Sequence, residues 1–185
     1  MKPATFALAL GTALLIAVPA AAAEDTTAPT LVEAQPSPDG HTHDEEWVEF
    51  ANPAPTALDL EGLFLTDHDA CFAPGEGYVE TYRLALDNVT VPARDRVVVE
   101  LPASPCLNLA DGGDDLFLED EQGKQIQQVA YGSEGELPAP GTGESLSACQ
   151  ATAERWSDRQ PMIHGDWSTA MASPGNANPS CSPGR

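Results

Sequence analysis

Short stretches of alternating apolar and polar residues, separated by turn residues, run through most of the chain. Residues 47–52 read WVEFAN, and residues 97–101 read VVVEL, the run with the strongest β propensity. Residues 116–131 predict a hairpin, with Gly123 in the turn at a position suited to positive φ. Beyond the first residues no segment keeps a helical period. Roughly seven to nine short strands at such intervals predict an all-β fold, an antiparallel sandwich or barrel.

Two irregularities interrupt this pattern. Ile126 and Val129 are three positions apart, so they cannot share a face of a regular strand, and we expect a β-bulge there. From Gly132 onward the chain is rich in Gly, Pro, Ser and Ala, and only residues 144–149, ESLSAC, predict a further strand. The C-terminal segment is therefore expected to be irregular.

The strand at 47–50 has two different faces. In a sandwich, Val48 and Phe50 would face the core between the sheets. Trp47 and Glu49 would then face outward or lie under a covering loop. We expect Glu49 to accept hydrogen bonds from backbone N–H groups of such a loop and to have a structural role.

The N-terminus has the layout of a secretory signal peptide. Lys2 precedes an apolar run without charges, and alanines at 20–23 supply a small-residue cleavage site. This predicts a signal peptide at 1–23, a short linker at 24–30, and one domain at 31–185. The alternative is an N-terminal membrane anchor, but the apolar run is short for a spanning helix. We expect a secreted, periplasmic or cell-surface protein with no membrane insertion after cleavage.

Acidic residues dominate the charge of the chain. It has 29 Asp plus Glu against 8 Lys plus Arg, a formal net charge of −21. Such a surface repels phosphate backbones, so no nucleic acid is expected as a partner. It favours cations as ligands or counter-ions, although a plain solvated acidic surface is the simpler interpretation.

Four cysteines, an even number in an exported chain, predict two disulfides. Three pairings are possible. We favour Cys71–Cys106 and Cys149–Cys181, which pair neighbours along the chain. No C-x-x-C motif supports a catalytic or zinc-binding thiol.

The usual hydrolase motifs are missing from the sequence. The segment GTGESLS lacks the G-x-S-x-G motif of serine hydrolases. His41 and His43 are close in sequence but lie in a Pro/Gly-containing loop, which disfavours a zinc centre. No catalytic residue is assigned, and the chain is expected not to be an enzyme.

Calcium is the better metal hypothesis, because it takes oxygen ligands and several aspartates fall in loops. A bridge between Cys71 and Cys106 would bring two of these acidic loops together. The alternative is that the aspartates cap their own turns. No other cofactor is expected, and the candidate calcium ligands are Asp67, Asp69, Asp111, Asp114 and Asp115.

Five segments together resemble the lamin tail domain in exported bacterial proteins. In order they are residues 46–52, 59–67, 114–123, 145–146 and 174–178. The resemblance implies an immunoglobulin-like β-sandwich, disulfide-stapled here, that serves as a binding module without catalytic residues. The cysteines and residues 148–167 lie outside the family's motifs.

These observations predict a non-catalytic exported β-sandwich that binds or scaffolds at the cell surface or in the extracellular space. The partner would be a protein or a surface polymer. Trp156 and Trp167 would stack on sugar rings if exposed, although packing over the end of the sandwich is the alternative. The competing function is a calcium-dependent hydrolase, or an accessory subunit of an exported enzyme.

Overall fold

The computed structural model consists of strands joined by turns and loops. In the residues it describes there is no helix long and apolar enough to cross a membrane. The described residues are 30–36, 45–67, 69–73, 75, 77–79, 81–102, 106–148 and 167–178. The predictions for the signal peptide at 1–23, for most of the linker at 24–30, and for His41, His43, Cys149, Trp156 and Cys181 fall outside these residues.

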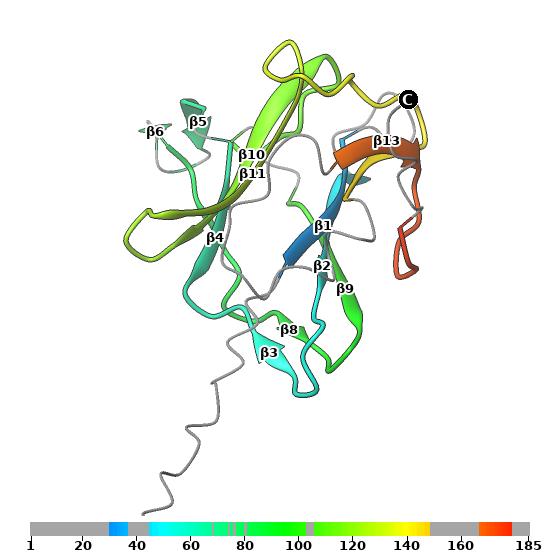
Figure 1. The fold of residues 1–185 in the computed structure, drawn as a ribbon. Coiled ribbons are helices and arrows are strands. Elements are labelled where there is room, and N and C mark those ends of the chain that lie inside the picture. Colours follow the sequence, from blue (N-terminus) through cyan, green and yellow to red (C-terminus); the bar gives the residue numbers. More distant parts are fainter. Residues whose placement is uncertain are drawn as a thin grey trace, which may run out of the picture.

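The strands form an all-β, antiparallel sandwich, as the sequence predicts (Figure 1). One sheet has the order β13-β12-β1-β2-β9 and the other β11-β10-β4-β7, and two further pairs are β3-β8 and β5-β6. The strand bounds are β1 Thr30–Gln35, β2 Trp47–Ala51, β3 Leu58–Asp59, β4 Leu63–Thr66, β5 Cys71–Ala73, β6 Gly77–Val79, β7 Leu84–Ala85, β8 Thr90–Val91, β9 Arg96–Glu100, β10 Gly113–Asp120, β11 Gln125–Gly132, β12 Glu144–Ala148 and β13 Trp167–Met171.

The core lies between the two larger sheets. Val48 and Phe50 of β2 are completely buried, which confirms the predicted inward face of this strand. They belong to one apolar cluster with Leu65 of β4 and Leu116 and Leu118 of β10. Burial of such side chains contributes about 1.5–3 kcal/mol each to stability.

A buried glutamine joins the two sheets. The register of β1 against β2 shifts between Leu31 and Glu33, which marks a bulge in β1. Gln127 of β11 accepts from the Leu31 amide at 3.0 Å and donates to the Leu31 carbonyl at 2.6 Å. Because Gln127 is fully buried, this pair of bonds satisfies polar groups that would otherwise be costly inside the sandwich.

The β10–β11 hairpin confirms two predictions. Gly123 has φ 73° in its turn, a backbone conformation that residues other than glycine rarely adopt. Leu118 pairs with Gln127, but Glu119 pairs with Gln125, so the partner strand gains one residue there. The extra residue is Ile126, which places the expected β-bulge in this strand.

One prediction about the C-terminal part is wrong. Residues 144–149 are not the only strand after Gly132, because β13 pairs antiparallel with β12 along its full length. Residues 167–171 read WSTAM and lack a clear alternation, so only pairing with β12, far along the chain, gives them strand structure. Trp167 is 5% exposed and joins the core, so it packs and does not offer a sugar-stacking face.

Candidate functional site

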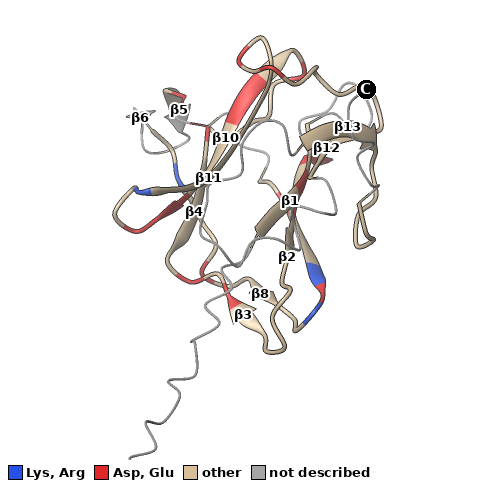
Figure 2. Ribbon diagram, viewed as in Figure 1, with Lys and Arg blue, Asp and Glu red and all other residues tan. Residues whose placement is uncertain are grey.

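Three of the five proposed calcium ligands lie close together beside the β4–β5 connection. Asp67 directly follows β4, Asp69 is two residues further, and Asp114 is in β10. The charges of Asp67 and Asp69 both act on the carboxylate of Asp114. Figure 2 shows acidic residues on β10 and nearby loops.

The other two proposed ligands do not join this group. Asp111 is exposed in the turn that precedes β10. Asp115 alternates with Asp114 along the strand and therefore points to the opposite face. Its carboxylate accepts a hydrogen bond from Gln128 Nε2 at 3.3 Å.

A disulfide between Cys71 and Cys106 holds the acidic loops together, which confirms this predicted pairing. The two Cα atoms are 5.1 Å apart, and both cysteines are buried. The bridge positions the segment that follows Cys106, where the Asn108 amide donates to Asp67 Oδ2 at 3.4 Å. It thus brings the end of β4 next to the start of β10.

Backbone amides already use the carboxylate oxygens of the two buried aspartates. Asp67 Oδ1 accepts from the Asp69 amide at 2.9 Å. Asp114 accepts from the Ala110 amide at 3.0 Å and from the Asp115 amide at 2.8 Å. These are the bonds of aspartates that cap their own turns.

The environment of these carboxyls disfavours their charged forms. The pKa of Asp114 is raised to about 6, mainly by burial and also by the charges of Asp67 and Asp69, while two backbone hydrogen bonds act to lower it. Burial also raises the pKa of Asp67. The pKa of Tyr131 is raised by burial and by the charges of Asp114, Glu46 and Asp111, and its hydroxyl donates to the Ala110 carbonyl at 2.9 Å.

This shift predicts that the free energy of unfolding falls as pH rises between 3.8 and about 6, the ordinary and folded-state pKa values of Asp114. The folded state binds the proton more tightly, so the stabilising contribution is complete below this interval and lost above it. Denaturant unfolding at a series of pH values measures the slope. Asp114→Asn should reduce the slope, whereas the exposed control Asp111→Asn should not. Equal slopes in wild type and Asp114→Asn would contradict the assignment.

Among the described residues, no three His, Cys, Asp or Glu side chains are placed to hold a metal ion together. Of the predicted ligands, Asp67 and Asp114 are the buried pair, and Asn108, whose amide donates to Asp67, has a buried Oδ1 atom without a hydrogen-bond donor. A bound ion would therefore have to replace some of the amides that now donate to the aspartates.

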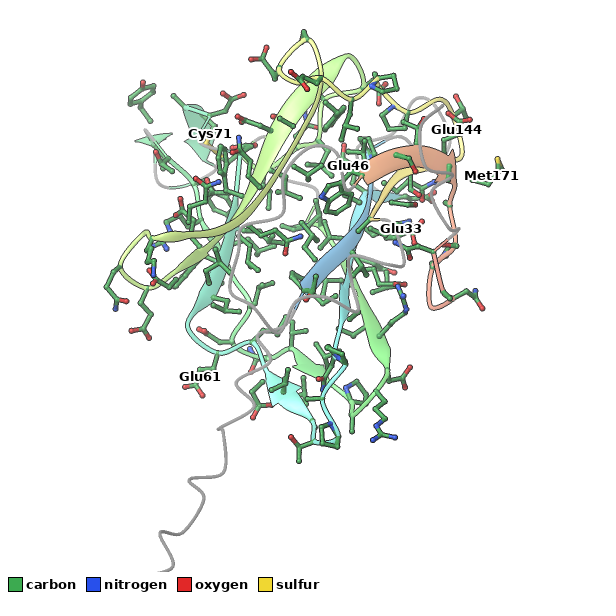
Figure 3. The ribbon with its side chains drawn as sticks, viewed as in Figure 1. Glu33, Glu46, Glu61, Cys71, Glu144 and Met171 are labelled. Carbon is green, nitrogen blue, oxygen red and sulfur yellow. A yellow bond between two sulfur atoms is a disulfide. The ribbon has the colours of Figure 1, made fainter. Side chains whose placement is uncertain are left out.

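A second polar cluster lies on the outer face of the five-stranded sheet. Residues 172–178, here called the C-terminal strap, follow β13 and cover this face. Glu33 of β1 accepts from the Ser173 amide at 2.8 Å and from its hydroxyl at 3.0 Å, and also from the hydroxyl of Ser145. Figure 3 shows Glu33 on the side of β1 toward the strap.

Glu49 is the second carboxylate of this cluster, directly opposite Glu33 in the β1–β2 ladder. It accepts from the Gly175 amide of the strap, which confirms the predicted hydrogen bond from a covering loop. Its Oε1 atom also forms an ion pair with Arg96 Nη1 at 2.7 Å. Burial raises the pKa of Glu49, and the bonds from Arg96 and Gly175 counteract this.

Sequence analysis missed Glu33 and Arg96 as partners in this cluster. The sequence did contain a signal for a buried carboxylate in each strand. In V-E-A at 32–34 and in V-E-F at 48–50, a glutamate stands between two apolar residues that face the core. A charged residue at such a position is rarely buried without a partner.

Comparison of the chain with protein-family models and with curated proteins finds no match.

Proposed function

We propose that the chain is an exported, non-catalytic interaction module of the lamin tail type, which binds a protein or a surface polymer outside the cell. The observation that carries the proposal is the set of hydrogen bonds made by polar side chains in the five segments that resemble the lamin tail domain. Several of these side chains tie a loop to the sandwich, as expected for a scaffold that presents its surface.

Three of these side chains illustrate the point. Glu46 accepts from the Leu109 amide at 2.9 Å. Asn52 donates to the carbonyls of residues 56, 91 and 92 at 2.8–3.1 Å. Asn178, at the end of the strap, donates to the carbonyls of residues 32 and 148.

The buried serine supports the absence of catalysis. Ser145 is fully buried, and its hydroxyl is engaged by Glu33 and by Ser147 Oγ at 3.0 Å. A nucleophile needs a path to the substrate and a base within reach, and a fully buried hydroxyl lacks the first. The buried disulfide favours an oxidising compartment and therefore export.

The stapled β5–β6 hairpin offers the best candidate contact surface. Tyr78 of β6 is 61% exposed and, with Met171 at 72%, is one of two large apolar side chains exposed in the described residues. Cys71 and Met171 lie on opposite sides of the molecule (Figure 3). Exposed tyrosines are common anchors in binding surfaces, since they bury much area with little loss of conformational freedom.

The test is binding of labelled mature protein, residues 24–185, to cell envelopes of the source organism. We expect saturable binding that Tyr78→Ala weakens about tenfold, the loss of one aromatic anchor. Met171→Ala is the matched control and should bind like the wild type. Absence of saturable binding, or equal binding by Tyr78→Ala, would contradict the proposal.

Calcium separates this proposal from the calcium-dependent hydrolase. A thermal melt of the oxidised protein is run in EDTA, then in calcium, then in zinc. A ligand at a hundred times its dissociation constant adds about 2.7 kcal/mol. A rise of several degrees in calcium, abolished by Asp67→Asn and Asp114→Asn, would show that the acidic loops form a calcium site. No shift with calcium or zinc would count against the calcium-dependent hydrolase.

A further inference from the structure

Strand β9 forms one edge of the five-stranded sheet. It pairs with β2 on one side. In the part of the chain that the structure describes, no strand pairs with its other side, and Figure 1 places it at the margin of the molecule. An edge strand presents a row of N–H and C=O groups that can pair with another chain.

The hydrogen bonds that flank β9 identify the groups directed outward. The Asn52 amide donates to the Asp95 carbonyl, and the Leu101 amide donates to the Glu46 carbonyl. Hydrogen-bonded pairs alternate in an antiparallel ladder, so the backbone groups of residues 97 and 99 point to β2. Those of residues 96, 98 and 100 therefore point away from it.

This edge has few of the features that prevent pairing. Its register against β2 is continuous, and it contains neither proline nor glycine. Val97, Val98 and Val99 are each only half-buried. Val97 and Val99 already pack against the core, so a neighbouring strand would extend the same apolar face.

The sequence of β9 is complementary to itself in the antiparallel direction. We propose that β9 pairs with β9 of a second copy of this chain, about a two-fold axis at Val98. This register sets Arg96 opposite Glu100 of the second copy and Val97 opposite its Val99. The outward backbone groups then form about six hydrogen bonds between the copies.

Charge favours this edge over the rest of a strongly acidic surface. The described residues contain four Lys or Arg, and two of them, Arg94 and Arg96, lie at the start of β9 (Figure 2). Arg96 uses Nη1 for Glu49 and Asn178, and its guanidinium has further donors. Arg94 and Arg96 balance the charges of Asp95 and Glu100, so residues 94–100 carry no net charge and little repulsion opposes the pairing of β9 with β9. This inference does not rest on the proposed binding function.

The experiment is sedimentation equilibrium of the oxidised mature protein from micromolar to millimolar concentration at physiological salt. We expect a reversible monomer–dimer equilibrium. Val98→Pro removes one outward N–H and no bond to β2, so it should weaken dimerisation at least a hundredfold with an unchanged circular dichroism spectrum. Glu100→Lys should weaken it about tenfold, because it sets two cations opposite each other.

Glu136→Lys is the matched control, since it makes the same charge change at an exposed site outside β9. It should dimerise at least as well as the wild type. If Val98→Pro fails to fold, the dimer dissociation constants of Glu100→Lys and Glu136→Lys still test the proposal. A wild type that stays monomeric throughout, or a Glu100→Lys variant that dimerises like Glu136→Lys, would overturn the proposal.

Discussion

Replacing Glu49 with alanine should lower the free energy of unfolding by about 3–5 kcal/mol, the usual cost of breaking a buried ion pair from one side. Glu49 is fully buried, and the side chain of Arg96 is only 17% exposed. The variant would leave the guanidinium without its carboxylate and the Gly175 amide without its acceptor. The strap would then lose one of its two carboxylate anchors.

Unfolding of the oxidised protein in guanidinium chloride at pH 7 measures this loss in the free energy of unfolding. The control is Glu61→Ala, an exposed glutamate that should change stability by less than about 0.5 kcal/mol. Glu49→Gln should fall between the two, because the amide keeps an acceptor oxygen but loses the charge. A Glu49→Ala variant as stable as Glu61→Ala would show that the ion pair contributes nothing net.

The parts of the fold that follow local periodicity were predictable. Val48 and Phe50 alternate with their neighbours and are buried as expected, and VVVEL forms most of an edge strand. The turn glycine and the bulge near Ile126 were predictable for the same reason, since both are local conflicts with a regular hairpin. Local pattern therefore identifies the fold class.

The parts that depend on distant contacts were not predictable. Strand β13 exists through its pairing with β12, across a connection of residues 149–166. Glu33 is buried where Ser145 and, far along the chain, Ser173 donate hydrogen bonds to its carboxylate. A pattern of residues along one strand cannot identify which segment will cover its outer face.

The candidate site was predictable in place but not in detail. Cysteine spacing suggested the bridge, and the bridge implied that the acidic loops meet. The sequence could not tell that Asp114 and Asp115 point to opposite faces, because that depends on where β10 begins. Nor could it assign the amides of Ala110 and Asp115 to Asp114, since these bonds depend on the path of the loop.

Replacing Cys71 and Cys106 together with serine should cost about 4 kcal/mol, because the bridge closes a loop between residues 35 positions apart. The loss should be greatest locally. A two-stranded hairpin such as β5–β6 is marginal without support, and the bridge is its covalent link to the start of β10. Amide hydrogen exchange should therefore accelerate most in residues 71–79 and 106–110.

The variant that lacks Cys71 and Cys106 should also change the burial and the pKa of Asp114 in the acidic loops. When the segment after Cys106 moves away, Asp114 loses burial and the Ala110 amide, and its pKa should return toward the ordinary value. The matched control replaces Cys149 and Cys181, which lie outside the described residues and whose predicted bridge would close a loop of similar length. Peptide mapping without reductant should find those two joined, and their replacement should leave exchange in residues 71–79 unchanged. Equal acceleration in both variants would show that the effect is global unfolding, and that the hairpin does not depend specifically on its own disulfide.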